Sequence, residues 1–151
     1  MLLALDIGNT EITVGLFQRN DLQAHWRLTT NPDRTPDEWG SAIGGFLVQS
    51  GHSPNEVRAV GLASVAPPVT QSIVEGIALS TGCTGVAVDA RTPLPVTLDV
   101  DEPLTVGADR IINTLAASRR HARDTVVVDL GTATTFDCIT ADGVFLGGVI
   151  A

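Results

Sequence analysis

Apolar residues in this chain gather in short blocks, and turn-forming residues separate one block from the next. Blocks of four to eight apolar or alternating residues are typical of strands. Three such strands are predicted at the start of the chain, at 2–5, 12–17 and 22–28. Five more are predicted further along, at 57–63, 86–88, 126–130, 134–139 and 144–149. Asp142-Gly143 predicts a hairpin turn between the last two strands.

Three helices are predicted between these strands. The first starts at the capping sequence Thr35-Pro36-Asp37-Glu38 and ends at Gly51. Its apolar face carries Trp39, Ile43, Phe46 and Leu47. The second helix opens at Pro67-Pro68 and ends near Gly82, and the third spans 106–121. Residues 89–105 hold three prolines and several acids and are expected to form a loop.

This order of elements predicts an α/β fold with a three-layer arrangement. The first seven elements read strand, strand, strand, helix, strand, helix, strand, and a linking helix and three more strands follow. We therefore expect a βββαβα lobe over residues 1–122, linking helix included. Residues 123–151 are expected to form the first strands of an incomplete second lobe.

A repeat supports this division. "LALDIGNT" from Leu3 and "VVVDLGTA" from Val126 share an apolar run, an aspartate, an aliphatic residue, a glycine and small polar residues. Asp6 and Asp129 lie 123 residues apart, and each copy runs on into another strand. One such match is within chance, but a match that also repeats the strand-turn-strand context indicates a duplicated unit.

Two glycine turns of this kind suit a polyphosphate ligand. Glycine lets backbone N–H groups approach phosphate oxygens. A carboxylate beside phosphate needs a cation between them, and Mg²⁺ takes one or two carboxylates together with phosphate oxygens. The alternative is a pair of ordinary Asp-Gly hairpins. A Walker A loop is excluded because it requires a lysine, and the chain has none.

A third group of residues lies at the start of the third helix, in Val106-Gly107-Ala108-Asp109-Arg110. Arg110 can clamp a carboxylate with two parallel hydrogen bonds. Asp109 can accept a proton from a substrate hydroxyl. The alternative is a helix-start carboxylate with an adjacent ion pair, which these five residues alone favour slightly.

The composition of the chain limits the classes of partner that it is expected to bind. The net charge of −8 argues against nucleic acid or an anionic membrane as the main partner. No apolar run reaches 18 residues and no signal-peptide pattern opens the chain, so we expect a soluble cytoplasmic protein. Cys83 and Cys138 are expected to be reduced thiols, and the three histidines have no metal-ligand spacing.

Together these motifs resemble the type III pantothenate kinases, which belong to the superfamily of acetate kinase, sugar kinases, Hsp70 and actin. "GADR" at Gly107 and "DLGTATTFD" at Asp129 are the most specific matches. Others run along the whole chain: "DIGNT" at Asp6, "WRLTT" at Trp26, "RTPDEW" at Arg34, "SVAPPVT" at Ser64 and "GGVIA" at Gly147. The resemblance implies an actin-like ATPase fold with a ribonuclease H-like first lobe.

The resemblance also implies roles for named residues. ATP and its phosphates would be bound by Asp6, Ile7, Gly8, Asn9, Thr10, Glu11, Ile12, Thr13, Gly131 and Thr132. Asp6 would lie near Mg²⁺, and Asp129 would help to hold K⁺ or NH₄⁺. Pantothenate would be bound by Val100, Gly107, Ala108, Asp109 and Arg110, with Asp109 as the general base. The reaction would convert ATP and pantothenate to ADP and 4′-phosphopantothenate in a homodimer.

Three features depart from the family pattern. Glu11 replaces the usual asparagine, Val100 replaces a tyrosine of the substrate pocket, and the family's second lobe normally continues beyond "GGVIA". A kinase that pairs with another copy, or with a chain supplying the rest of the second lobe, is the main hypothesis. The alternative is a truncated or catalytically weak relative that acts as a binding or regulatory protein. A second lobe cut after three strands is expected to leave an apolar sheet face uncovered.

Overall fold

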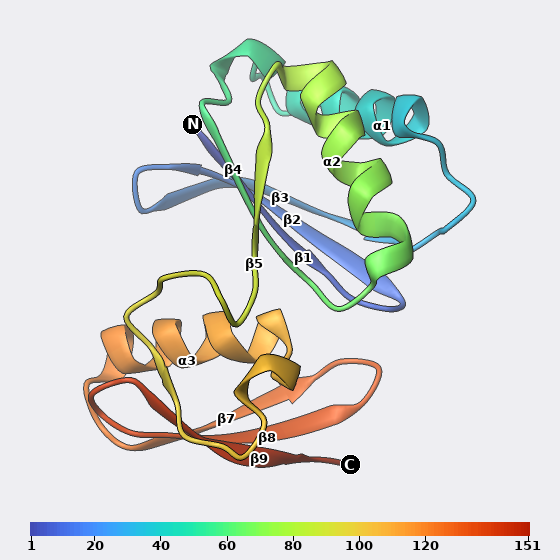
Figure 1. Cartoon of the computed structure of the whole chain (residues 1–151). Helices are drawn as coiled ribbons and strands as arrows, with labels where there is room; N and C mark the ends of the chain where they lie inside the picture. The colour runs from blue at the N-terminus through green and yellow to red at the C-terminus, as the bar shows by residue number, and fades with distance from the viewer. The chain divides into compact units, whose positions relative to one another are not determined.

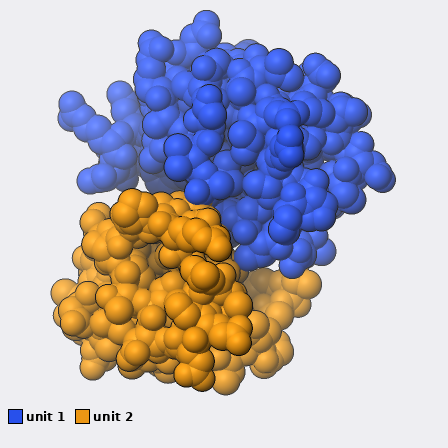
Figure 2. Space-filling model, in the orientation of Figure 1, with its two compact units in different colours: residues 1–87 blue, residues 88–151 orange.

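The computed structural model describes residues 1–151, which group into two compact units. Unit 1 spans Met1–Ala87 and unit 2 spans Val88–Ala151 (Figure 2). Each unit has its own sheet, and helices lie against one face of that sheet (Figure 1). No helix is both long and apolar enough to cross a membrane.

Unit 1 is built on a sheet with the strand order β3-β2-β1-β4-β5. The strands are β1 (Leu2–Ile7), β2 (Glu11–Gln18), β3 (Asp21–Thr29), β4 (Ala59–Ser64) and β5 (Gly85–Val88). β1 pairs antiparallel with β2 and parallel with β4, so it is central. The three opening strands predicted from the sequence are confirmed, and the order through β5 is the predicted βββαβα order followed by a strand.

Both helices of unit 1 start at prolines, as predicted. α1 (Pro36–Gln49) has the predicted capping box, in which the Glu38 N–H donates to Thr35 Oγ1 and the Thr35 N–H donates to Glu38 Oε2. That second bond is the main reason why the pKa of the Glu38 carboxyl lies below its usual value. α2 (Pro67–Thr81) ends at Gly82, which has the left-handed conformation typical of a helix C-terminus.

The core of unit 1 lies between the two helices and the sheet. Leu3, Leu5 and Ile7 of β1 are buried against residues of α1 and α2. The two helices come into close contact at Gly40 and Gly76: a Cβ added to Gly76 would lie 2.5 Å from the Pro36 carbonyl oxygen and 2.8 Å from the Gly40 nitrogen. Only glycine leaves room for this approach of two backbones.

Gly76→Ala therefore tests the helix contact. We expect it to lower the free energy of unfolding by roughly 1–3 kcal/mol, because the added methyl group meets backbone that cannot move aside. Gly45→Ala is the matched control, since it lies in α1 with nothing within 4 Å of its added Cβ. That control should raise stability by about 0.5–1 kcal/mol. Equal effects of the two substitutions in urea titrations would contradict the contact.

Unit 2 has a sheet with the strand order β6-β9-β8-β7. Its strands are β6 (Thr97–Leu98), β7 (Thr125–Leu130), β8 (Thr134–Ile139) and β9 (Val144–Ile150). The helix α3 (Ala108–His121) packs on one face through Ala117, against the buried side chains of Ile139 and Phe145. A small second core results.

Some boundaries differ from those predicted. The region 89–105 is not only loop, because β6 pairs in parallel with β9 and a short 3₁₀ turn forms at Pro103–Thr105. Residues 54–56 form a 3₁₀ turn, so β4 starts at Ala59 rather than Val57. The third helix starts at Ala108, after Gly107 as its N-cap. α3 belongs to unit 2 by its contacts.

The face of the unit 2 sheet opposite α3 is apolar and exposed. On β7, Val126, Val128 and Leu130 are 57%, 49% and 80% exposed, and β7 is also an outer strand of its sheet. Phe136 of β8 and Val149 of β9 pair across the same face and are exposed too. The uncovered apolar face predicted from the sequence is thus present in unit 2.

An exposed apolar face beside an unpaired strand edge favours association. We expect the 151-residue chain on its own to self-associate in light scattering, and Val128→Lys to reduce that association. Val48→Lys is the matched control, because Val48 is 63% exposed near the end of α1. A monodisperse monomer at high concentration would contradict the prediction. Equal effects of Val128→Lys and Val48→Lys on association would contradict it too.

Candidate functional site

The first predicted phosphate loop is the turn between β1 and β2. The Gly8 N–H donates to the Glu11 carbonyl at 3.0 Å, so the turn is tight and Asn9 and Thr10 form its exposed tip. A Cβ on Gly8 would lie 2.9 Å from that carbonyl oxygen. The side chains of Ile7 and Ile12 are buried, so only their backbone could face a ligand.

Asp6 lies on the face of the sheet away from α1 and α2. It is exposed, and it stands opposite the exposed Thr13 across the β1–β2 pair. Glu11, the acid that departs from the family pattern, is exposed and pairs with Arg27 at 3.6 Å. Its charge is therefore partly balanced within unit 1, and its side chain reaches toward β3.

Thr30 holds this turn from the side. Its hydroxyl donates to the Gly8 carbonyl at 2.7 Å, and its N–H donates to the Thr10 carbonyl at 2.9 Å. The Val65 N–H donates to the Ile7 carbonyl at 3.0 Å. The carbonyls of Ile7, Gly8 and Thr10 thus accept hydrogen bonds from outside the turn. Neighbouring segments therefore hold the loop, in addition to its own hairpin bonds.

Thr30→Val removes the hydroxyl and keeps the shape of the side chain. We expect a loss of about 1 kcal/mol in the free energy of unfolding, because the Gly8 carbonyl loses a partner. We also expect faster hydrogen exchange at the Gly8 amide. Thr29→Val is the matched control, because Thr29 is exposed and it is Thr30 that donates to the Gly8 carbonyl. No difference between the two variants in either measurement would show that Thr30 does not hold the turn.

The second predicted phosphate loop is the turn between β7 and β8. The Gly131 N–H donates to the Ala133 carbonyl at 3.1 Å, and Gly131 and Thr132 are exposed. Thr134 and Ala151 exchange two backbone hydrogen bonds of 3.0 and 2.8 Å, which extend the sheet beside the turn. Asp129 is half-buried and pairs in register with Thr135.

The two hairpins confirm the strand-turn-strand repeat. In each, an aspartate stands one residue before the end of the first strand, and that strand pairs antiparallel with the next. The repeat aligns Leu3, Leu5 and Ile7 with Val126, Val128 and Leu130. The first three are buried under two helices, and the second three are exposed.

Asp109 lies in the first turn of α3, one residue after buried Ala108. A carboxylate is electrostatically favoured at this end of a helix. Its Oδ1 accepts the Arg110 N–H at 2.8 Å. Asp109 is half-buried, at the point where the helix leaves Gly107.

Arg110 is paired with Asp137 of β8. Its Nε donates to Asp137 Oδ1 at 2.8 Å, one of its terminal nitrogens donates to the same oxygen, and its guanidinium lies 5.1 Å from the centre of the Phe145 ring. Asp137 is fully buried, and the Arg110 side chain is 17% exposed. Arg110, which the sequence predicts to bind a carboxylate, thus uses part of its hydrogen-bonding capacity within unit 2.

The residues present fit the cations that the motifs imply. Asp6 offers an exposed carboxylate, and carboxylates together with phosphate oxygens are the ligands that Mg²⁺ prefers. Asp129 offers a half-buried carboxylate beside the Gly131 turn, where a Cβ on the glycine would lie 4.0 Å from Asp129 Oδ1. Neither group of residues includes three clustered acidic, histidine or cysteine side chains that could hold a metal unaided.

The family model of type III pantothenate kinase matches residues 2–151 of this chain. The chain belongs to the type III pantothenate kinase family. A relative of that name from Thermomicrobium roseum is 41% identical over 151 residues, and one from Roseiflexus sp. is 42% identical. All of this chain is covered in both comparisons, but only 58% and 59% of the relatives. The chain therefore spans a little over half the length of the curated relatives that it matches.

Solved structures agree on the fold. A protein described as a 2-dehydro-3-deoxygalactonokinase from Sinorhizobium meliloti has a TM-score of 0.59 at 12% identity, covering 99% of this chain and 53% of that one. A ROK hexokinase from Thermus thermophilus has a TM-score of 0.52 at 12% identity, covering 93% and 47%. A protein described as a Baf family transcriptional activator from Campylobacter jejuni has a TM-score of 0.52 at 20% identity, covering 99% and 53%. The predicted actin-like ATPase fold is confirmed.

Within this type III pantothenate kinase family member, sequence reasoning missed three supporting residues. Thr30 and Asp137 lie in the motifs "WRLTT" and "DLGTATTFD", but the sequence alone assigned a role neither to them nor to Phe145. A charged residue amid apolar strand positions is the signal that could have singled out Asp137. Val100 packs against the small core of unit 2. A pocket on unit 2 is lined by Val126, Cys138 and Leu146 among others, and by no predicted site residue.

Proposed function

We propose that this chain takes part in the ATP-dependent phosphorylation of pantothenate to 4′-phosphopantothenate, the first step of coenzyme A synthesis. The observation that carries the proposal is the family match over 2–151, which includes both Asp-Gly hairpins and the Asp109-Arg110 helix start. The local geometry supports it, because each hairpin offers exposed turn residues and a carboxylate at a strand end.

In this proposal Asp109 is the general base. Its carboxylate accepts the proton of the primary hydroxyl of pantothenate as the hydroxyl oxygen attacks the γ-phosphorus of ATP. The bond from the γ-phosphorus to the bridging oxygen breaks, and ADP leaves. Val100, Gly107, Ala108 and Arg110 bind the acceptor, and the first turn of α3 orients Asp109 through the Arg110 N–H.

The two glycine turns bind the phosphates of ATP in this proposal. Backbone and side-chain donors come from 7–13 and from Gly131 and Thr132, and Thr30 keeps the first turn in shape. Asp6 holds Mg²⁺ and Asp129 holds K⁺ or NH₄⁺. When bound, these cations neutralise phosphate charge that would otherwise repel the two carboxylates.

The proposal extends to assembly and location. Residues 1–122 act as the first lobe of the actin-like fold with its linking helix, and 123–151 as the opening strands of the second. The protein works as a homodimer, or pairs with a chain that supplies the rest of the second lobe, in the cytoplasm. The exposed apolar face of β7, β8 and β9 supports such pairing.

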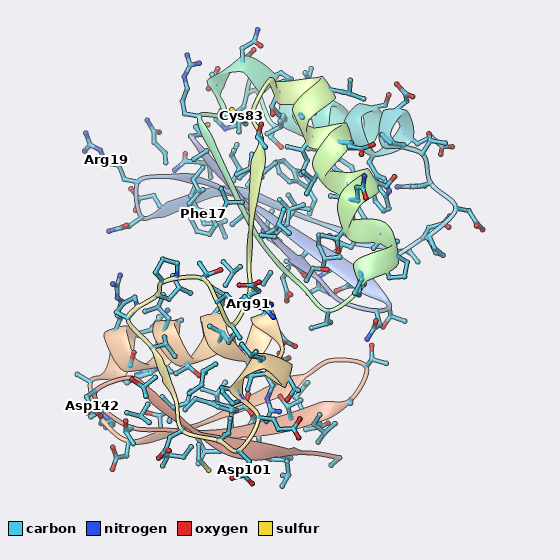
Figure 3. The ribbon with its side chains drawn as sticks, in the orientation of Figure 1. Phe17, Arg19, Cys83, Arg91, Asp101 and Asp142 are labelled. Atoms are coloured by element: carbon cyan, nitrogen blue, oxygen red, sulfur yellow. The ribbon has the colours of Figure 1, made fainter.

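Asp109→Asn tests the proposal. We expect pantothenate-dependent release of ADP from the wild-type chain with ATP, Mg²⁺ and K⁺, and a loss of at least about 100-fold in the variant, since general bases contribute 10²–10⁴-fold. Circular dichroism and the melting temperature should be unchanged. Asp142→Asn is the matched control, because Asp142 lies at the exposed tip of the β8–β9 hairpin (Figure 3).

The assay is run on the chain alone and on the chain joined to the part of the Thermomicrobium roseum relative that the match leaves uncovered. Release in either protein that requires pantothenate and disappears with Asp109→Asn supports the kinase. Folded proteins that release no ADP would contradict it and would favour the alternative of a binding or regulatory relative. Full activity in the variant would remove Asp109 from the mechanism.

A further inference from the structure

We propose that Asp137 is a positioning residue for substrate binding. It holds the guanidinium of Arg110 so that the remaining N–H groups of Arg110 are presented to the carboxylate of the acceptor. The inference rests on the proposed function, because it concerns the same acceptor site. It adds a residue of β8 and the Phe145 ring to a site that is otherwise formed at the start of α3.

The hydrogen bonds define which edge of Arg110 is used. Nε and one terminal nitrogen both donate to Asp137 Oδ1. A guanidinium has five N–H groups, so three remain for another acceptor. The Phe145 ring covers one face of the guanidinium at 5.1 Å. One edge and one face are thus fixed, and the unused N–H groups keep one orientation.

The surroundings of Asp137 make this arrangement rigid. Asp137 is opposite Gly148 in the β8–β9 pair. A Cβ on Gly148 would lie 2.5 Å from Asp137 Oδ1 and 2.6 Å from a terminal nitrogen of Arg110, and it would also overlap the Phe136 carbonyl. β9 therefore lies directly against the ion pair, so the guanidinium has no room to move toward β9.

The buried charge of Asp137 also restricts the movement of Arg110. A fully buried carboxylate requires a partner, and Arg110 is the cation that contacts Asp137. The other oxygen, Asp137 Oδ2, is buried without a hydrogen-bond partner, so Arg110 makes both side-chain hydrogen bonds of this carboxylate. Arg110 cannot rotate toward a substrate without leaving a buried charge unpaired. Its position is set before the substrate arrives, and preorganisation of this kind improves binding.

Kinetics of the variants test the assignment. We expect Asp137→Asn to raise the KM for pantothenate roughly tenfold, because small displacements of a positioning group are costly. The KM for ATP and the kcat should stay within about twofold of wild type. Phe145→Leu should raise the KM for pantothenate in the same direction by a smaller factor. This second variant keeps every charge and tests the same guanidinium if Asp137→Asn does not fold.

A double variant separates positioning from simple loss of stability. If Asp137 acts through Arg110, Asp137→Asn should cause no further rise in the KM for pantothenate once Arg110→Met is present. Asp142→Asn is the control and should leave both KM values unchanged.

A lowered melting temperature with unchanged KM values in Asp137→Asn would overturn the assignment, as would additive effects in the double variant. A wild-type protein without pantothenate-dependent turnover would instead overturn the proposed function, and the assignment with it.

Discussion

Side chains on a strand alternate between two faces, and the rest of this structure depends on how the first strand uses that rule. Burying Leu3, Leu5 and Ile7 under α1 and α2 forces Asp6 to the opposite face, one residue before the strand ends. The tight turn at Gly8 then returns the chain to pair Thr13 with Asp6. A carboxylate beside exposed turn residues is thus a direct result of packing the core of unit 1.

Side chains also alternate between the two faces in the second hairpin, but there the helix covers the face that carries the aspartate. The alternation on β7 separates the exposed Val126, Val128 and Leu130 from Asp129, which shares its face with Val127 and with Asp137 across the strand pair. α3 packs on that second face, so its first turn brings Arg110 to Asp137. The apolar face that remains is the counterpart, through the repeat, of the face that α1 and α2 cover in unit 1.

Much of this could be predicted from the sequence because the signals were local. The capping box at Thr35, the prolines that open α1 and α2, and the repeated Asp-aliphatic-Gly turns depend on neighbouring residues. β6 could not be predicted, because its two residues form a strand only by pairing with β9, which lies more than 40 residues away. The partner of Arg110 was missed for the same reason, since α3 and β8 meet only in the folded chain. Thr30 supports the first turn across 22 residues of sequence.

In the proposed function, the helix start at Asp109 and Arg110 presents pantothenate to the phosphate of ATP. The most direct measurement is mass spectrometry of pantothenate after incubation with ATP, Mg²⁺, K⁺ and the folded protein, alone or joined to the region uncovered in the Thermomicrobium roseum relative. We expect a pantothenate product that carries one added phosphoryl group and that is absent with Asp109→Asn. Unmodified pantothenate from both folded proteins, or a phosphorylated product that forms equally with Asp109→Asn, would contradict it.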